Sequence, residues 1–322
     1  MHPIAVYYEH PDWFRPLFAE LERRRLPFVR LDAAAHRFDP AERVSPYSLV
    51  VNRASPSAYL RGHGGSTFHT LHWLRHLERI GVPVINGSKV YGYELSKATQ
   101  LDMLCELGLP FPRSVVINAP ALAASAAEDL RYPVLVKANI GGSGAGITRY
   151  DSATALHDAV ARGGVTLGID GVALVQEAAP LRDAHITRVE TLHGRYLYAI
   201  HVYSDTGSFD LCLADACQTT SGVTLVGAAC AVDAVKSGLR VEAYTPPAEI
   251  IAQVERISRF TGLDIGGIEY LVDDRDGKHY FYDVNALSNF VADAPTVIGF
   301  DPWTNFVDYI EERIASAVGL PA

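Results

Sequence analysis

Short apolar runs alternate with amphipathic segments over the first 95 residues of the chain. The amphipathic segments at 12–25 and 66–80 repeat apolar residues with helical periodicity, and Asp12 stands where a helix N-cap is expected. The apolar runs predict four strands, at 3–8, 27–32, 48–53 and 83–86. Strands that alternate with helices are typical of an open α/β layer, which we expect over residues 1–92.

From about residue 130 the pattern changes from strand–helix units to pairs of strands. Hairpins are predicted at 187–203 and 264–285, and two strands flank the glycine-rich stretch 141–146. Further helices are expected at 96–107 (with Ser96 as N-cap), 119–131, from 153 onward, at 248–260 and at 302–318, with a strand at 171–177. The later chain is therefore expected to form α+β layers with antiparallel sheets, in a small lobe at 93–172 and a C-terminal lobe at 173–322.

Composition and charge exclude several classes of protein. The 322 residues are 48% hydrophobic and carry a net charge of −9, and no basic cluster suggests a nucleic-acid groove. No apolar run approaches the ~20 residues of a membrane-spanning helix, and the N-terminus does not resemble a signal peptide. We therefore expect a cytoplasmic protein without nucleic-acid or membrane partners, whose four cysteines are free thiols.

Three histidines, His69, His72 and His76, share one face of the predicted helix at 66–80. Their spacing would suit a metal ion, the lining of a substrate pocket or a solvated face. No Cys or carboxylate partner is evident nearby in the sequence, which favours the two non-metal interpretations.

The glycine-rich stretch "GGSGAG" at 141–146 follows Lys137, and its sequence can be compared with two known phosphate-binding loops. The dinucleotide pattern needs a third glycine where Ile147 stands, and the Walker pattern needs a Gly-Lys-Ser/Thr ending that is missing here. Both of those loops also lead into a helix, whereas this one joins two predicted strands. It is therefore predicted to be a hairpin loop whose free amide groups can cover phosphates.

Two carboxylates and an amide are predicted to converge in the hairpin at 264–285. A three-residue loop at 275–277, with Gly277 in the left-handed conformation, places Glu269 opposite Asp283, and Asn285 lies on the same face as Asp283. Carboxylates about 5 Å apart repel by roughly 3 kcal/mol at an effective dielectric constant of 20, so the pair favours a bound cation. Hard oxygen ligands of this kind suit Mg²⁺ that also contacts phosphates.

These elements, in this order, resemble the ATP-grasp superfamily, and most closely its RimK-like and glutamate-ligase-like carboxylate–amine ligases. The resemblance rests on Lys97, on Lys137 with its glycine loop, on the segment Gln176–Glu177, on Arg188 and on the set Glu269, Asp283 and Asn285. It implies a pre-ATP-grasp α/β layer followed by a two-lobed ATP-grasp domain. It covers roughly residues 85–320.

The resemblance also implies a site. Lys97 and Lys137 would contact the ATP phosphates, which Gly141, Gly142, Ser143 and Gly144 would cover. Gln176, Glu177 and Ala178 would meet the adenine, and Asp183 would hold the ribose. Glu269, Asp283 and Asn285 would hold Mg²⁺, two ions in all, with Mn²⁺ as an alternative metal. Arg188, together with Lys137, would act catalytically at the transferred phosphoryl group and the acyl intermediate.

The reaction implied is an ATP-dependent ligation of a carboxylate to an amine through an acyl phosphate, with release of ADP and phosphate. A phosphotransferase that stops at a phosphorylated product is the alternative. The sequence departs from the family pattern after Asn285, where "ALSNF" replaces a Pro–Gly turn. Arg53 and Asp215, with Arg188, are predicted to contact the substrates, which are small-molecule or peptide carboxylates and amines. Homodimers and tetramers are common in the family, so a homo-oligomer stays open.

Overall fold

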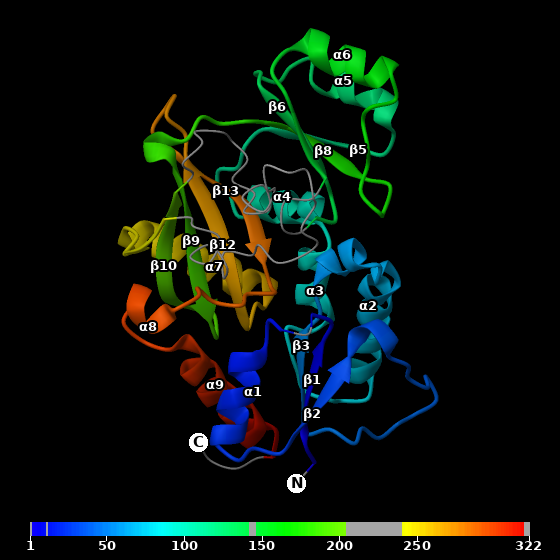
Figure 1. Cartoon of the computed structure of the whole chain (residues 1–322), viewed down its shortest axis with the longest axis vertical. Coiled ribbons are helices and arrows are strands. Elements are labelled where there is room, and N and C mark those ends of the chain that lie inside the picture. Colours follow the sequence, from blue (N-terminus) through cyan, green and yellow to red (C-terminus); the bar gives the residue numbers. More distant parts are fainter. Residues whose placement is uncertain (1, 11, 142–145, 204–239, 319–322) are drawn as a thin grey trace.

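The computed structural model describes residues 2–10, 12–141, 146–203 and 240–318, and its strands form three separate sheets (Figure 1). The predicted Asp215, Gly142, Ser143 and Gly144 lie outside the described residues, as do Cys212, Cys217 and Cys230. Cys105 is described, and it is an exposed free thiol. Within these ranges no helix is long and apolar enough to cross a membrane.

The N-terminal sheet is parallel, as the alternating pattern predicts. Its strand order is β2-β1-β3-β4, from β1 (Ile4–Tyr8), β2 (Phe28–Asp32), β3 (Leu49–Arg53) and β4 (Val84–Ile85). The connections hold the helices α1 (Arg15–Arg23) and α2 (Gly64–Arg79) and the 3₁₀ turns η1 (Ala33–Ala35) and η2 (Pro56–Arg61). The side chains of β1 alternate between two cores: Ile4 and Val6 join the α1 side, while Ala5 and Tyr7 join the α2 side.

Helix α1 begins later than expected. Its N-cap is Phe14, and no side chain caps it. The predicted N-cap Asp12 is wrong, because its carboxylate instead accepts a hydrogen bond from the guanidinium of Arg15. At the other end of the helix, Arg24 bonds Asp308 and Glu311 at 2.5 Å each, which joins α1 to the C-terminal helix.

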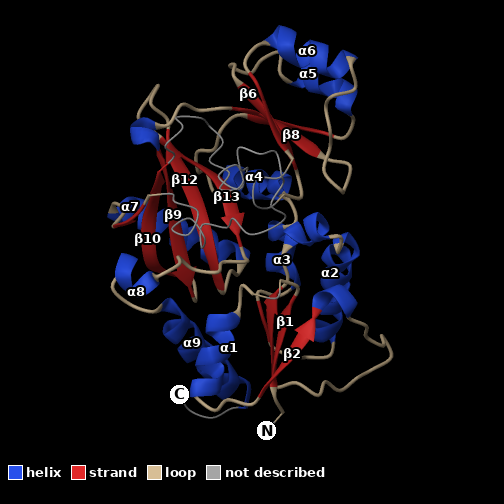
Figure 2. Cartoon of the chain, viewed as in Figure 1, coloured by secondary structure: helices blue, strands red, loops and turns tan. Residues whose placement is uncertain are grey.

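The small lobe has an antiparallel sheet that holds the glycine-rich hairpin. The order is β5-β8-β6-β7, from β5 (Ser114–Ile117), β6 (Val134–Ala138), β7 (Ile147–Tyr150) and β8 (Ala173–Glu177). The sheet therefore extends past the boundary expected at residue 172, because β8 pairs with β5 and β6. The helix expected at 119–131 is shorter, with η3 (Pro120–Leu122) and α5 (Ala123–Ala126). Helix α5 lies with α6 (Ala153–Ala161) beside the sheet (Figure 2).

Two short helices lead from the N-terminal sheet to the small lobe. They are α3 (Ser88–Glu94) and α4 (Lys97–Glu106). The predicted N-cap of α4 is confirmed, since the Ser96 hydroxyl accepts a hydrogen bond from the amide of Thr99 at 3.1 Å.

The C-terminal sheet is antiparallel, and it contains both predicted hairpins. Its order is β11-β10-β9-β12-β13, from β9 (His185–Leu192), β10 (Arg195–Tyr203), β11 (Val241–Tyr244), β12 (Ile265–Val272) and β13 (His279–Asn285). The helical elements of this lobe are η4 (Arg182–Ala184), α7 (Ala248–Thr261), α8 (Ala294–Val297) and α9 (Pro302–Val318). The short edge strand β11 was not predicted, because its four residues alternate too briefly to stand out.

The two faces of the C-terminal sheet differ in chemistry. Val189, Ile268 and Phe281 point into an apolar core with α7 and α4. The opposite face carries Arg188, Glu269 and Asp283, because side chains alternate along β9 and β12 and a β-bulge between Phe281 and Asp283 shifts β13 by one residue. This second face carries the candidate site.

Candidate nucleotide and metal site

Arg188, Glu269 and Asp283 form one row across three adjacent strands. Glu269 on β12 lies opposite Arg188 on β9 and opposite Asp283 on β13. The Nη1 atom of Arg188 donates to Oε1 of Glu269 at 2.8 Å. The predicted opposition of Glu269 and Asp283 is confirmed, and the β9–β12 pairing adds Arg188 to the same row.

The register of this hairpin arises differently from the prediction. The amide of Asp273 donates to the Lys278 carbonyl at 2.9 Å, so the predicted three-residue loop is wrong and the turn has one residue more. A β-bulge then adds Tyr282 to β13, which restores the opposition of Glu269 and Asp283. Gly277 has the predicted left-handed conformation, with φ of +72°. The bulged Tyr282 is itself part of the site, since its hydroxyl donates to Oε2 of Glu269 at 2.8 Å.

The guanidinium of Arg188 is buried between two carboxylates. Its Nε atom donates to Oε1 of Glu190 at 2.6 Å, and its Nη1 atom donates to Glu269. A Cβ atom at Gly267 would lie 2.6 Å from both Cζ and Nε of Arg188, so a side chain there has no room. Gly267 and the two carboxylates therefore fix the position of Arg188.

The two candidate metal ligands titrate in opposite directions. Burial raises the pKa of Glu269, and the nearby Asp283 charge raises it further against the effect of Arg188. Burial alone would also raise the pKa of Asp283, but the charges of Lys97 and Lys137 outweigh burial and hold it below its ordinary value. Asp283 is therefore the carboxylate that stays ionised most readily.

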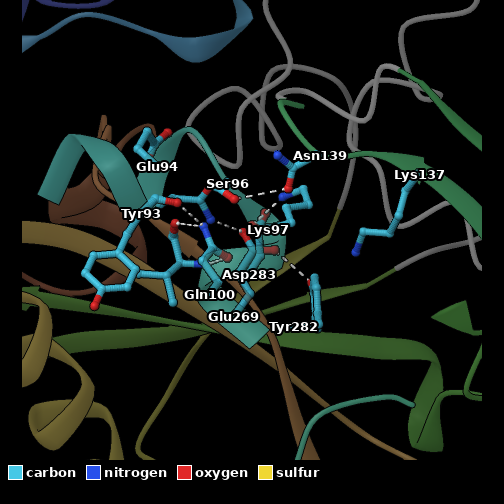
Figure 3. Close-up of polar contacts among 12 residues, drawn as sticks. Tyr93, Glu94, Ser96, Lys97, Gln100, Lys137, Asn139, Glu269, Tyr282 and Asp283 are labelled. Carbon is cyan, nitrogen blue, oxygen red and sulfur yellow. Dashed lines mark hydrogen bonds and ion pairs between the residues drawn. The ribbon is translucent and has the colours of Figure 1, made fainter. Parts of the chain in front are cut away.

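Lys97 reaches Asp283 from the first turn of α4. Its Nζ atom bonds Oδ1 of Asp283 at 2.5 Å (Figure 3). Asn139, just after β6, fixes this helix end, since its Oδ1 accepts from the amide of Ala98 at 2.9 Å and its carbonyl from the Lys97 amide at 3.3 Å. A Cβ atom at Gly141 would lie 3.4 Å from Cε of Lys97, so the start of the glycine-rich loop passes close to this lysine.

Lys137 approaches the same face from the small lobe. Its side chain extends from β6 towards the side where Tyr282 and Asp283 lie (Figure 3), and its Nζ is 5.9 Å from the Tyr282 ring centroid. Nζ also donates to Oε1 of Gln176 at 3.1 Å. The lysine is only 5% exposed. The structure therefore brings Lys97, Lys137 and Gln176 together with the carboxylate row.

The remaining members of the predicted adenine segment are engaged within the small lobe. The Glu177 carboxylate accepts from the backbone and the guanidinium of Arg131, at 3.1 and 3.0 Å. The amide of Ala178 donates to the Pro133 carbonyl at 2.9 Å. The predicted ribose ligand Asp183 is exposed and has a φ of 58° just before β9.

Arg53 is fully buried at the end of β3. Its Nη1 atom donates to the Ala286 carbonyl at 3.4 Å and its Nη2 atom to the Ser288 carbonyl. Its guanidinium also lies 5.3 Å from the Phe14 ring centroid. In this structure Arg53 holds the segment that follows β13.

Glu190, Tyr282 and Glu94 were not predicted from the sequence. Glu190 is two residues from Arg188 on the same strand, and that spacing was the one available signal. Burial and the Asp283 charge raise the pKa of Glu94 to about 7, and its carboxylate accepts from the Ala286 amide. Tyr282 had no signal in the sequence, because a β-bulge places it in the site.

Two of the three histidines of α2, His69 and His76, lie in a cluster of imidazole and aromatic rings. Nε2 of His69 lies 3.1 Å from Nδ1 of His36, His76 is buried against Phe38, and His72 is exposed. Throughout the described ranges, no group of three or more His, Cys, Asp and Glu residues is arranged to hold a metal ion. A metal at the carboxylate row would therefore need the Asn285 amide as its third protein ligand. Two carboxylates and an amide are the oxygen donors that suit Mg²⁺.

At the level of sequence, this chain shows little similarity to known proteins. No protein-family model matches the chain. A 103-residue stretch is 35% identical to the carbamoyl phosphate synthase large chain of Hyperthermus butylicus. The match involves 30% of this chain and spans 10% of that protein's length.

At the level of structure, several known proteins are similar to this chain over almost its whole length. The ATP-grasp ligase PsnB, in complex with a variant of its minimal precursor, Mg and ADP, aligns with a TM-score of 0.67 at 17% identity, covering 98% of this chain and 99% of PsnB. The D-cycloserine synthetase DcsG aligns with a TM-score of 0.67 at 17% identity, covering 97% and 99% of the two chains. D-alanyl-alanine synthetase A from Vibrio cholerae aligns with a TM-score of 0.66 at 15% identity, covering 98% and 99%. The chain therefore has the ATP-grasp fold.

Proposed function

We propose that this protein is an ATP-dependent ligase that joins a carboxylate to an amine through an acyl phosphate. One observation carries the proposal, namely the row of Arg188, Glu269 and Asp283 into which Lys97 and Lys137 extend from other elements. Buried carboxylates and cations that converge in this way fit a site for a phosphorylated substrate. The fold is shared with proteins described as ligases and synthetases, which favours ligation over a phosphotransferase.

Lys97 and Lys137 are proposed to bind the ATP phosphates. Lys97 bonds Asp283, and its ammonium would exchange this carboxylate for phosphate oxygens when nucleotide binds. Lys137 is held by Gln176, and an ammonium so positioned serves as a point charge for phosphate. The loop at 141–146 is proposed to cover the phosphates, and Gln176, Glu177 and Ala178 to meet the adenine, with Asp183 at the ribose.

Glu269, Asp283 and Asn285 are proposed to hold Mg²⁺. Bound Mg²⁺ would neutralise charge on the phosphate oxygens during phosphoryl transfer. The ionised state of Asp283 suits this role, since Lys97 and Lys137 lower its pKa. A second ion and a role for Mn²⁺ are parts of the same proposal.

Arg188 is proposed to act at the group that is transferred. It keeps a fixed orientation because Glu190 and Glu269 each accept a hydrogen bond from it. A planar cation held in this way can stabilise charge on the phosphoryl group and then on the acyl phosphate without rearranging. Lys137 would supply a second positive charge on the side of the small lobe.

Amino acids and peptides are the proposed substrate class. PsnB has been solved in complex with a precursor peptide, and two other proteins of this fold are synthetases of D-cycloserine and of D-alanyl-alanine. A carboxylate of an amino acid or peptide would be activated, and an amine of the same class would accept it. The protein is proposed to be cytoplasmic, which agrees with an activity that consumes ATP.

The test is an ADP-release screen with free amino acids and short peptides as acids and amines, repeated with hydroxylamine as the nucleophile. A ligase traps its acyl phosphate as a hydroxamate. We expect acid-dependent ADP release and hydroxamate formation together. A phosphorylated product that is stable and resists hydroxylamine would establish the phosphotransferase instead.

A further inference from the structure

Glu190 is a buried carboxylate, and among the described residues only one of its two oxygens has a hydrogen-bond partner. Its Oε1 atom accepts a hydrogen bond from Nε of Arg188, whereas Oε2 has no hydrogen-bond partner in the part of the chain that the structure describes. Only 1% of the residue is exposed. A carboxylate oxygen in this position is unfavourable for folding, because burial removes its hydration without a replacement. Such a cost is typical of functional sites.

Asn289 is a second buried polar side chain of this kind. It is 2% exposed, and neither its Oδ1 nor its Nδ2 atom has a hydrogen-bond partner in the part of the chain that the structure describes. A side-chain amide has two donors and an acceptor to satisfy. An apolar residue of similar size would avoid this loss, so packing alone does not explain an asparagine here.

The fold brings these two side chains to the same region. Glu190 lies opposite Gly267 and Tyr198, and Gly267 lies opposite Asn285, so one row crosses β13, β12, β9 and β10. The chain leaves β13 at Asn285, and six residues later the Val291 amide donates to the Tyr198 hydroxyl at 2.9 Å. Residues 286–290 therefore cross the sheet along this row, and in Figure 1 this orange segment passes over the lower ends of the strands before α8. Asn289 lies on that crossing.

This row is next to the candidate phosphate row. Glu190 is two residues beyond Arg188 on β9, about 7 Å along the strand. It lies on the same face as Arg188, and β9 runs away from the sheet that holds β6 (Figure 1). Gly267 has no side chain, and the Arg188 guanidinium lies over it, between Asn285 and Glu190. A molecule that attacks an acyl phosphate held by Arg188 would approach from this side.

We propose that Glu190 and Asn289 form the site for the amine nucleophile, with Oε2 of Glu190 as its proton acceptor. This inference rests on the proposed ligase function. An ammonium group supplies the hydrogen-bond donors that the free carboxylate oxygen lacks, and the Asn289 amide offers both a donor and an acceptor to the rest of an amino acid or peptide.

The proton and bond changes balance without another reactant. The ammonium gives one proton to Oε2 of Glu190, and the freed nitrogen lone pair attacks the carbonyl carbon of the acyl phosphate. The C–N bond forms, the C–O bond to phosphate breaks, and the phosphate leaves with that electron pair. The second nitrogen proton passes to the phosphate, and Glu190 returns its proton to solvent.

The decisive experiment compares amide and hydroxamate formation in Glu190→Gln, with ATP and an acid that gives hydroxamate with the wild type. Glutamine keeps an oxygen acceptor for Nε of Arg188 but cannot take a proton. Hydroxylamine is a neutral nucleophile near pH 7 and needs no base. We expect the ratio of amide to hydroxamate to fall about a hundredfold or more, the usual size of a general-base contribution.

A matched control is Glu20→Gln. Glu20 is also a buried, arginine-paired carboxylate, but it lies on α1 and bonds Arg23 and Arg24. Its substitution is expected to leave the ratio unchanged. A parallel loss of amide and hydroxamate in Glu190→Gln would overturn the proposal, because Glu190 would then act only by positioning Arg188. Wild-type protein that forms no hydroxamate with any acid would instead overturn the ligase function itself.

Asn289→Leu tests the second residue and separates binding from folding. Leucine has a similar volume and no polar atoms, so we expect thermal stability to rise or stay constant while the KM for the amine rises at least tenfold. The KM for ATP is expected to change little. An unchanged amine KM, or a loss of stability that accompanies the kinetic change, would remove Asn289 from the site.

Discussion

The guanidinium of Arg188 lies directly over Gly267 of the neighbouring strand. Any Cβ atom at Gly267 would come within 2.6 Å of Arg188 Cζ, which is closer than non-bonded carbon atoms approach. Two residues from different strands thus depend on each other, because the arginine fills the space that the glycine leaves. This relationship gives a substitution that disturbs the site without removing any of its polar groups.

Gly267→Ala is expected to displace Arg188 and to lower ATP-dependent ligation about a hundredfold. A shift of about 1 Å in a positioning group is enough for such a loss. The measurement is initial-rate ADP release with a substrate pair from the screen, together with thermal unfolding. Gly65→Ala is the control, since a Cβ atom at Gly65 meets nothing within 4 Å, and alanine should stabilise α2 slightly. Equal activity of the two variants would show that the position of Arg188 does not matter for turnover.

The hairpin pattern in the sequence predicted that Glu269 and Asp283 lie opposite each other, but not the turn length and the bulge that produce this register. Alternation and a turn signal placed Glu269 opposite Asp283, and the structure agrees only because the longer turn and the bulge at Tyr282 offset each other. Arg188 enters the row through the pairing of β9 with β12. Local pattern does not specify that pairing, since about 80 residues separate the two strands in sequence.

Long-range packing also decided which predicted residues reach the site. Arg53 ends a strand, as a substrate contact might, but its partners are carbonyls of a segment more than 230 residues away. The same segment also places two residues that were not predicted. Asn289 lies on it where it crosses the sheet, and the carboxylate of Glu94 accepts a hydrogen bond from its Ala286 amide. By contrast, the N-cap at Ser96 and the left-handed Gly277 depend on neighbouring residues, and the sequence predicted both.

Glu269→Gln with Asp283→Asn is expected to abolish Mg²⁺-dependent ATP turnover. The double change removes both ionised oxygen donors but keeps the size of the side chains, and it leaves Lys97 and Arg188 without carboxylate partners in this row. The measurement is ADP release against Mg²⁺ concentration. Turnover close to that of the wild type would mean that the metal binds elsewhere.

Lys137→Ala is expected to weaken ATP binding about tenfold to a hundredfold. The lysine is buried and its ammonium is held by Gln176, so its loss removes a preorganised positive charge. Isothermal titration calorimetry with a non-hydrolysable ATP analogue gives the affinity directly. Lys278→Ala, in the exposed turn between β12 and β13, is the control for loss of positive charge. Unchanged nucleotide affinity in Lys137→Ala would exclude this lysine from the site.

Arg53→Met is expected to lower the free energy of unfolding by about 2–4 kcal/mol, because the buried carbonyls of Ala286 and Ser288 lose a charged donor. Methionine retains much of the apolar volume against Phe14. The measurement is urea denaturation followed by circular dichroism. If Arg53 instead contacts the substrate carboxylate, the variant will keep its stability and show a higher KM for the acid.

Acidification is expected to weaken the packing of residues 36–38 against α2. Burial and the neighbouring His69 lower the pKa of His36 to about 4, and the two rings lie in hydrogen-bond contact at 3.1 Å. A histidine with a folded pKa below its unfolded value of about 6.5 binds more protons when unfolded, so its contribution is complete above that value and is lost as the pH falls towards 4. We expect a loss of about 1 kcal/mol between pH 7 and 4.5, because the ring is only partly buried and solvent reduces the effect. Thermal unfolding of His36→Phe across this range should show a flatter pH dependence than the wild type, whereas His157→Phe, at an exposed position of α6, should follow the wild type. Parallel curves for His36→Phe and the wild type would place the acid sensitivity elsewhere in the chain.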